Sequence, residues 1–566
     1  MSTKDIYVEK PWLKFYPKGV PANIKYEEIC LHDVLERTIS KYGQQDALIF
    51  QGFRITYNDL GDMVNRLAYF FNSKGIKKGD VVAILLPNMI QTVAAYYAAL
   101  KIGAIVQMNN PLYTDRELSY QFNDSGAKIL VTLDLLANRM IALRKDTKIK
   151  NIIYTSIGDY LPSVKKILFK LVAKKKGMAA DVPATEDVYS WPDAVKEAGS
   201  LSKIKISFDD VAAYQYTGGT TGASKGAILT HRNLCSMVQM YRAWFPTLIE
   251  GNEMLISAAP IFHVLGMSAA MNLPVFMGWT AVMIPKPQPP DLLAATRKYR
   301  PTVCSMVPTM YVGMLQHPDL KKTDMSCYKV LSSGGSSLPV EVLKQFKDLT
   351  GADINEGFGM TETSPQTHLN PFGGHHKAGS IGLPYPDTEV RIVDLATGKK
   401  SMPAGKEGEL IFKGPQVTKG YLKKPQETAK AIRNGWLYSG DIAYMDKDGY
   451  FFIVDRMKDL IISSGYNVYP REIEEVLYEH PGIQKAAAIG LPDEKRGEKI
   501  KVFAVPNEGT TLDTEEVMKY CQERLAKYKW PSLIEVRSSL PESTVGKILK
   551  KDLKKEEEDK RKQQKR

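Results

Sequence analysis

Cysteine is scarce in this sequence, which has five cysteines among 566 residues and no Cys-x-x-Cys pair. An odd count at wide spacing excludes a small disulfide-stabilised scaffold and gives no zinc-binding pattern. The first residues also lack the basic-then-apolar order of a secretory signal. We therefore expect a protein that works in a reducing compartment, the cytoplasm.

Long apolar runs without interruption are lacking as well. Two stretches, 81–100 and 254–285, carry no charged residue, and each is long enough to cross a bilayer. Proline and asparagine interrupt both of them. We therefore predict strand, loop and helix in the first stretch, and strand, loop, helix and strand in the second. The second would form a deep core or the wall of a large apolar pocket.

Charge of the two signs is not balanced, because 76 Lys and Arg against 63 Asp and Glu give a net charge of +13. Such an excess favours anionic partners. A polynucleotide-binding surface should interleave aromatic residues with a basic stripe, and no segment does so; we predict no nucleic-acid partner. The segment 550–566 mixes nine basic with five acidic residues and is expected to be a frayed, solvated tail.

The segment 164–176 combines apolar residues at helical spacing with six lysines and no acidic residue. A basic amphipathic helix is typical of elements that lie on a membrane surface. A solvated surface helix docked on the core explains the pattern equally well. The residues of the apolar side are Val164, Ile167, Leu168, Leu171 and Val172.

The chain up to about residue 435 alternates short apolar runs with helical patterns. Several runs are rich in β-branched residues and do not alternate, as expected of strands covered on both faces. This favours an α/β fold, with a large N-terminal domain of several subdomains whose β-sheets are flanked by helices. Representative predicted strands are 81–86, 129–132, 152–155, 254–258, 281–284 and 303–307.

The pattern changes after Gly435. Three short runs, 436–438, 442–445 and 450–454, indicate antiparallel strands with a hairpin turn at Asp448-Gly449. Beyond this region, helical and strand patterns alternate over about 100 residues and predict a small α+β unit. We place the two domains at 1–457 and 458–566.

The strongest local signal is the run Tyr-Thr-Gly-Gly-Thr-Thr-Gly-Ala-Ser-Lys-Gly, which begins at Tyr216 after an apolar strand pattern. Its glycines permit close backbone approach, and successive free N–H groups form a nest for anions. The threonine hydroxyls and Lys225 add donors and a positive charge, which suits nucleotide β- and γ-phosphates. It is not a Walker A loop, because Lys225 lies between serine and glycine. Alone, the run fits a surface turn equally well.

Two further loops carry polar groups. Asn-Glu-Gly-Phe-Gly-Met-Thr-Glu-Thr, 355–363, lacks the third glycine of a dinucleotide fingerprint. Its Thr361 and Glu362 offer a hydroxyl and a carboxylate, which suit a Mg²⁺–phosphate site. The loop Ser-Ser-Gly-Gly-Ser-Ser, 332–337, follows a predicted strand and exposes backbone against which a purine or an acyl carbonyl could pack.

Five motifs in order give the chain a family resemblance. The Thr/Gly/Lys loop and the Gly-Phe-Gly-Met-Thr-Glu element are followed by the runs 438–441, 455–459 and 544–547. Together they resemble the adenylate-forming enzymes: acyl-CoA synthetases, peptide-synthetase adenylation domains and beetle luciferases. The closest resemblance is to bacterial long-chain fatty-acid–CoA ligases, through Asp-Tyr-Leu-Pro before the basic segment and Pro-Ile-Phe-His at 260–263. Ser224 stands where many members have proline, and Phe358 where tyrosine is usual.

The resemblance implies a two-step reaction and a small C-terminal domain that moves between the steps. A carboxylate attacks the α-phosphorus of ATP to give acyl-AMP and pyrophosphate, and the thiol of coenzyme A then displaces AMP. Because a carboxylate attacks a polyanion poorly, such a site must neutralise charge and align groups. ATP, Mg²⁺, coenzyme A and a fatty acid are the implied ligands.

The resemblance also assigns roles to residues. Glu362 would bind Mg²⁺, Thr361 would lie near the α-phosphate, and Lys547 would reach the α-phosphate and acyl carboxylate. Asp441 would accept both ribose hydroxyls, and Arg456 would support ribose or phosphate. The β- and γ-phosphates would be held by Thr217, Gly218, Thr220, Thr221 and Lys225.

The remaining implied positions line the acyl and adenine side or serve the second step. Lys458 would act as the hinge, and Gly465 would let the pantetheine arm pass close to the backbone. Taken singly, Asp441 is more simply explained as a turn residue, Lys547 as a surface lysine and His263 as a core histidine. The ordered set of motifs favours their functional roles instead. The lining positions are His263, Gly335 and Gly357, and Phe358 and Gly359 are expected to help bind the cofactor.

We therefore predict a long-chain fatty acid–CoA ligase that is AMP-forming. The alternatives are an aryl- or medium-chain acid–CoA ligase, a fatty acyl-AMP ligase that transfers to a carrier protein, and a basic binding protein without this activity. The 164–176 segment would give a peripheral contact with the inner face of the membrane, and a homodimer is left open.

Overall fold

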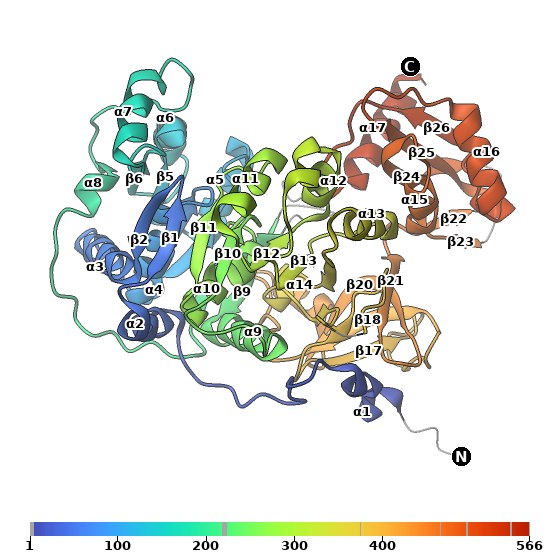
Figure 1. Cartoon of the computed structure of the whole chain (residues 1–566), viewed down its shortest axis with the longest axis horizontal. Coiled ribbons are helices and arrows are strands. Elements are labelled where there is room, and N and C mark those ends of the chain that lie inside the picture. Colours follow the sequence, from blue (N-terminus) through green and yellow to red (C-terminus); the bar gives the residue numbers. More distant parts are fainter. Residues whose placement is uncertain are drawn as a thin grey trace.

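The computed structural model describes residues 5–217, 224–373, 375–463, 466–493, 496–543 and 546–564. A large N-terminal part carries three β-sheets, and a smaller C-terminal part carries a fourth, at the right-hand end of Figure 1. The predicted α/β fold with a small α+β C-terminal unit is confirmed. The predicted boundary at 457/458 stays a prediction.

One sheet of the large part has seven strands, and all neighbouring pairs are parallel except the last. The β-branched runs of the sequence form its buried centre, as strands covered on both faces require. In spatial order the strands are β7 (Val188–Ser190), β6 (Asn151–Thr155), β5 (Ile129–Leu133), β3 (Val81–Leu85), β4 (Ile105–Met108), β8 (Val211–Thr217) and β9 (Lys225–Thr230).

A second sheet has nine strands, with a parallel centre and antiparallel pairs at both ends. Its order is β16 (Leu383–Pro384), β15 (His368–Leu369), β14 (Asn355–Phe358), β13 (Val330–Ser333), β12 (Val303–Met306), β10 (Met254–Ser257), β11 (Thr280–Met283), β1 (Asp46–Phe50) and β2 (Phe53–Thr56).

Helices cover these two sheets, and α4 (Ile90–Lys101) contacts strands of both, so that all but its last residue is buried. The other helices of eight or more residues in this part are α2 (Leu31–Tyr42), α3 (Tyr57–Ser73), α5 (Asp115–Ser125), α6 (Asp134–Arg144), α7 (Ser163–Val172), α9 (His231–Trp244), α11 (Pro289–Tyr299), α12 (Pro308–Gln316) and α13 (Val340–Thr350).

The two uncharged stretches have the structure that the sequence predicts. The first forms β3 and α4; the second forms β10, the π-helix η2 (Gly266–Asn272), α10 (Leu273–Met277) and β11. None of the helices in the described part of the chain has the length and apolar content that crossing a bilayer requires.

The third sheet pairs β17 (Glu389–Val393), β18 (Gly408–Lys413), β20 (Trp436–Met445) and β19 (Ile432–Arg433), with β21 (Phe451–Arg456) on β20. The prediction of separate strands at 436–438 and 442–445 is wrong, because β20 runs through both. Gly440, at φ +72°, lies in this strand and allows the local irregularity of the pairing. The turn predicted at Asp448-Gly449 is present, with Gly449 at φ +89°.

The C-terminal unit packs three helices on one sheet. Its strands are β22 (Ile461–Ser463), β23 (Tyr466–Val468), β24 (Ile483–Asp493), β25 (Gly497–Pro506) and β26 (Leu533–Val536). Its helices are α15 (Pro470–Tyr478), α16 (Thr514–Arg524) and α17 (Lys550–Gln564).

The expectation of a frayed, solvated tail is wrong for α17. Leu553 is fully buried in an apolar cluster with residues of β24 and β25. Charged residues of α17 also pair with the unit: Lys550 Nζ lies 2.8 Å from a Glu474 carboxylate oxygen, and Glu557 lies 2.7 Å from Lys501 Nζ. One apolar anchor and these ion pairs hold a segment whose composition resembles a solvated tail.

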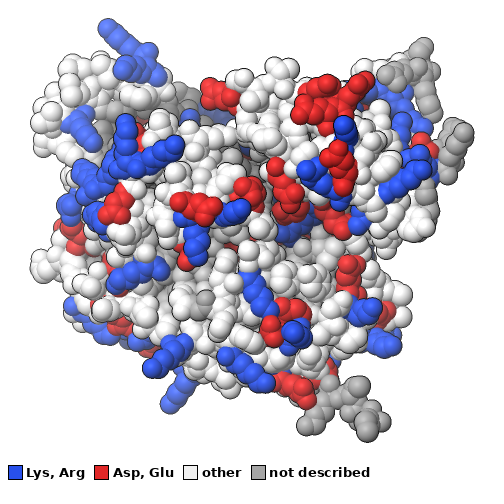
Figure 2. All heavy atoms as spheres, turned by 45° about the vertical axis from the view of Figure 1, so that its right-hand side comes forward, with Lys and Arg blue, Asp and Glu red and all other residues white. Residues whose placement is uncertain are grey.

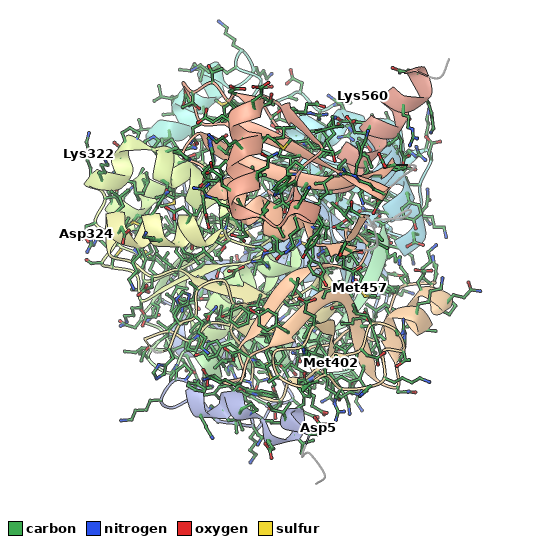
Figure 3. All side chains as sticks on the ribbon, turned by 90° about the vertical axis from the view of Figure 1, so that its right-hand side faces the viewer. Asp5, Lys322, Asp324, Met402, Met457 and Lys560 are labelled. Carbon is green, nitrogen blue, oxygen red and sulfur yellow. The ribbon has the colours of Figure 1, made fainter. Side chains whose placement is uncertain are left out.

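The C-terminal unit contacts the large part directly. The Arg471 guanidinium donates to the Ile453 carbonyl of β21 at 2.8 Å, and the Tyr469 hydroxyl donates to Glu407 at 2.5 Å. Met457, labelled in Figure 3, lies where the chain passes from β21 to this unit. The residues that follow β21 therefore lie at the junction of the two parts.

Candidate active site

A buried carboxylate and three cations come together at the junction. Asp441 of β20 and Arg456 of β21 are paired in register, and the Arg456 Nε lies 3.2 Å from the Asp441 carboxylate. Asp441 is only 3 % exposed, and burial raises its pKa although Arg456, Lys547 and Lys458 oppose this effect. Asp441 is therefore not a turn residue, because it is buried within the strand β20.

Lys547 extends from the C-terminal unit into this cluster. Its backbone carbonyl accepts the Ser543 N–H at 2.8 Å, and the preceding Gly546 has φ +69°. A Cβ at Gly546 would lie 2.2 Å from the Thr309 hydroxyl of α12, so only glycine lets the turn approach the large part so closely.

The surroundings of Lys547 disfavour its charge. Burial, followed by repulsion from Arg456, lowers its pKa to about 7, although Asp441 acts in the opposite direction. An anion placed beside this amine would favour its protonated form and raise its pKa. Lys547 is therefore a half-buried amine within electrostatic range of Asp441 and Arg456, and not one more exposed lysine of the surface.

His263 belongs to the same neighbourhood. Burial lowers its pKa to about 4, and the charge of Lys547 adds to this effect. Its Nδ1 accepts the Leu265 N–H at 3.3 Å, which leaves the ring proton on Nε2. His263 is therefore neutral at physiological pH and can contribute a hydrogen-bond donor, but not a positive charge.

The glycines of β14 and the loop after β13 shape a close-packed wall. A Cβ at Gly357 would lie 2.8 Å from the Gln366 amide nitrogen, and one at Gly359 would lie 2.0 Å from the Pro365 carbonyl oxygen. Gly335 has φ +89°, which favours glycine. Phe358 packs toward an aromatic cluster, its ring centroid 6.0 Å from that of Phe412. Contact of these residues with a ligand stays a prediction.

A second polar cluster joins the phosphate-loop lysine to the predicted metal carboxylate. Glu362, 6 % exposed, accepts the Tyr421 hydroxyl at 2.7 Å. Lys225, at the start of β9, lies 2.5 Å from a Glu427 carboxylate oxygen and 5.2 Å from the Tyr421 ring centroid. One carboxylate beside the Thr361 hydroxyl fits Mg²⁺, which commonly takes one or two carboxylates together with substrate phosphates.

Tyr421 and Glu427 were missed by sequence reasoning. Tyr421 reaches the site through an isolated bridge with Ala227, and Glu427 lies on the short helix α14 (Pro425–Ala431). Neither residue belongs to the motifs that the sequence analysis singled out. No local signal could have found them, because only the tertiary fold brings them to Lys225.

Part of the predicted phosphate site lies outside the described residues. Gly218, Thr220 and Thr221 are among these residues, and Gly465 also lies outside the described part of the chain. The flanks are described: Thr217 ends β8, Lys225 begins β9, and the two residues are paired across the strands. The predicted loop thus connects two adjacent antiparallel strands.

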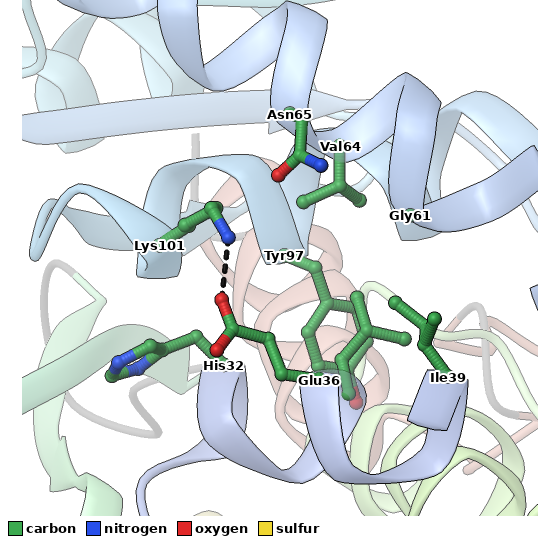
Figure 4. A pocket seen from close by; sticks show the side chains of 9 residues that line it. His32, Glu36, Ile39, Gly61, Val64, Asn65, Tyr97 and Lys101 are labelled. Atoms are coloured by element: carbon green, nitrogen blue, oxygen red, sulfur yellow. Dashed lines mark hydrogen bonds and ion pairs between the residues drawn. The ribbon is translucent and has the colours of Figure 1, made fainter. Parts of the chain in front are cut away.

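Two other features lie apart from this site. A cavity of about 270 Å³ lies between α2, α3 and α4, and its lining includes Tyr97 and Lys101. Lys101 forms an ion pair with Glu36 there (Figure 4). None of the predicted site residues lines this cavity. Cys30, His32 and His231 bring potential metal ligands within 4.8 Å of one another. However, the His231 Nδ1 accepts the Leu31 N–H, which leaves the proton on Nε2, so we assign no metal there.

Comparison with known proteins identifies the class. The chain matches the AMP-binding enzyme family over residues 35–422 and the AMP-binding enzyme C-terminal domain over residues 472–547. The chain therefore belongs to the AMP-binding enzyme family, as its ordered motifs predict.

Individual relatives cover nearly the whole chain. The long-chain-fatty-acid–CoA ligase of Bacillus subtilis (strain 168) is 42 % identical, over 97 % of this chain and 98 % of that protein. The protein of the same name from Escherichia coli O6:H1 is 37 % identical over the same shares. The structure of ATP-bound MatB from Rhodopseudomonas palustris has a TM-score of 0.78 and 30 % identity, over 93 % of this chain and 99 % of that one. The resemblance to bacterial long-chain fatty-acid–CoA ligases is confirmed.

Proposed function

We propose that the chain is an AMP-forming long-chain fatty acid–CoA ligase. The observation that carries this proposal is the approach of Lys547, from the C-terminal unit, to the Asp441–Arg456 pair of the large part. Full-length relatives with this name, at up to 42 % identity, support the substrate class. The buried 254–285 region, which forms η2, α10 and two strands, supports an apolar substrate.

In the first step, a carboxylate oxygen of the fatty acid bonds to the α-phosphorus of ATP. The bond from this phosphorus to the bridging oxygen breaks, and pyrophosphate leaves with the electron pair. Lys547 stabilises the negative charge that collects around the α-phosphorus, and Asp441 accepts the ribose hydroxyls. Glu362 would hold Mg²⁺, which would supply neutralisation of the phosphate charge.

In the second step, the thiolate sulfur of coenzyme A bonds to the acyl carbon, and AMP leaves with the carboxylate oxygen. We propose that the C-terminal unit, residues 458–566, turns about Lys458 between the steps. This motion would remove Lys547 and bring Gly465 to the site. The proposed hinge residue directly follows Met457 at the junction of the two parts.

We place this activity in the cytoplasm, in peripheral contact with the inner face of the membrane, where free fatty acids partition. Basic and acidic side chains are mixed over the face shown in Figure 2, and we propose small-molecule ligands as the partners. A homodimer stays a prediction, which light scattering on the purified full chain tests.

The test is pyrophosphate release with MgATP across acids from acetate to stearate, with benzoate and coumarate, each with and without coenzyme A. The expected result is sustained turnover only with coenzyme A and a maximum at long aliphatic chains. Maximal turnover with an aryl or short-chain acid would contradict the proposed substrate class but would leave the two-step mechanism in place. A single burst that does not depend on coenzyme A would indicate a carrier-protein acceptor.

A further inference from the structure

Helix α7 and the turn after it expose an apolar surface. Val164 and Leu171 are 72 % and 69 % exposed, and Ile167 and Leu168 are 62 % and 57 % exposed. Val172 and Met178 extend the same surface. The six residues are called the α7 surface below. Side chains of this kind normally face the core when they recur along one side of a helix.

The apolar stripe of α7 does not face the core, although the helix itself is docked there. Ala173 is buried and Phe169 packs on the core, its ring so close to Gly158 that a Cβ there would lie 2.7 Å away. Because successive helical residues are about 100° apart, Leu171 and Ile167 lie on the side opposite to Ala173. Phe169 and Ala173 therefore anchor the helix on the core, and the apolar stripe remains exposed on the opposite side.

Lysines flank this stripe at both ends of α7. Lys165, Lys174, Lys175 and Lys176 are exposed, and no acidic residue occurs between positions 160 and 180. Lys165 is fixed close to the protein by donating to the Gln51 carbonyl at 2.8 Å, and Lys174 pairs with Asp181 at 2.5 Å. An apolar stripe bordered by lysines is complementary to a bilayer with anionic headgroups, where acyl chains lie directly beneath the phosphates.

We propose that the α7 surface binds an anionic phospholipid bilayer, with its apolar side chains among the acyl chains and its lysines at the phosphates. The inference rests on the proposed function, because it locates the contact that brings the enzyme to its fatty acid. Figure 1 shows α7 at the upper left and the C-terminal unit at the opposite end of the long axis. A membrane contact at α7 therefore leaves the C-terminal unit free to turn.

Sedimentation of the full chain with vesicles tests the apolar part of the proposal. The expected result is binding to phosphatidylcholine vesicles that contain a quarter of phosphatidylglycerol, and little binding to phosphatidylcholine alone. The double variant I167S/L171S should lower the partition coefficient by at least about tenfold, because apolar burial scales with the inserted area. The matched control is I249S, since Ile249 is 55 % exposed in another part of the chain.

The lysines have a test of their own. The triple variant K174E/K175E/K176E should abolish the preference for phosphatidylglycerol, and added salt should weaken binding of the unmodified protein. The control variant K321E/K322E also removes exposed lysines, but it lies away from α7 and should keep the preference.

Three outcomes would overturn the inference: equal binding to neutral and anionic vesicles, an equal loss in I249S, or a change of oligomeric state by light scattering in I167S/L171S without a change in vesicle binding. The last would assign the surface to a second copy of the chain. Ligation of dissolved octanoate separates the two proposals. If the unmodified protein ligates octanoate but ignores vesicles, only the membrane contact fails; if it binds vesicles but ligates no acid, only the proposed function fails.

Discussion

The weakly held proton of Lys547 leads to a prediction about the pH dependence of the first step. Burial and neighbouring cations lower the pKa of this amine from 10.5 to about 7. At about 1.4 kcal/mol per pKa unit, the protein makes the protonated form roughly 5 kcal/mol more costly, relative to the neutral form, than it is for a lysine side chain in water. The proposed role requires the protonated form, which is lost from the nucleotide-free enzyme as the pH rises through about 7.

The kinetic parameters should separate accordingly. In acyl-AMP formation, kcat/KM for ATP reports the free enzyme and should fall above about pH 7. The corresponding fall in kcat should occur at higher pH, because bound triphosphate favours the charged amine. Replacing Lys547 by alanine should remove this fall and slow acyl-AMP formation by about 100- to 1000-fold, the usual loss for one transition-state donor.

The assay measures pyrophosphate release for the first step and thioester formation from preformed acyl-AMP for the second. K547A should lose much less in the second step, because Lys547 has then left the site. K551A is the matched control, since Lys551 is exposed on the neighbouring helix. Equal losses of K547A in both half-reactions, or an alkaline limb that survives in this variant, would refute the reasoning.

Three further predictions concern single contacts. E427Q should lower KM for MgATP severalfold with kcat nearly unchanged, because Lys225 no longer has to leave a carboxylate at 2.5 Å; a raised KM in steady-state kinetics would contradict this. D441N should raise KM for ATP by about 10- to 100-fold, the cost of a lost charged hydrogen-bond partner, and an unchanged KM would remove Asp441 from the nucleotide site. L553A should destabilise the C-terminal unit by about 2–5 kcal/mol in denaturant unfolding, while K551A, on the exposed side of α17, should not.

Much of the fold and part of the site could be predicted because their signals are local. The buried strands β3, β5 and β6 consist of β-branched runs, and such runs specify strands without reference to the rest of the chain. Lys225 and Glu362 stand inside contiguous motifs whose residue types match their chemistry. Their neighbours Tyr421 and Glu427 could not be found, because only long-range packing places them at the phosphate loop.

The errors have the same physical origin. The segment 550–566 has the composition of a solvated tail, but α17 is fixed by Leu553 and by ion pairs with partners far away in the sequence. The periodicity of 164–176 correctly predicts a helix over most of its length. The periodicity could not say which side docks, because Phe169 and Ala173 are selected by the shape of the core and not by their hydrophobicity alone.

The arrangement around Lys547 also gives a physical reason for the proposed movement between the two steps. With no nucleotide bound, burial and the charges of Arg456 and Lys458 penalise the protonated amine more than Asp441 and Asp459 stabilise it. In the proposed reaction, a bound triphosphate would supply the missing negative charge and would therefore favour the position of the C-terminal unit seen here. When pyrophosphate left, most of that charge would leave with it and the penalty on Lys547 would return. Withdrawal of the lysine would then be favoured at the point in the cycle where coenzyme A must take its place.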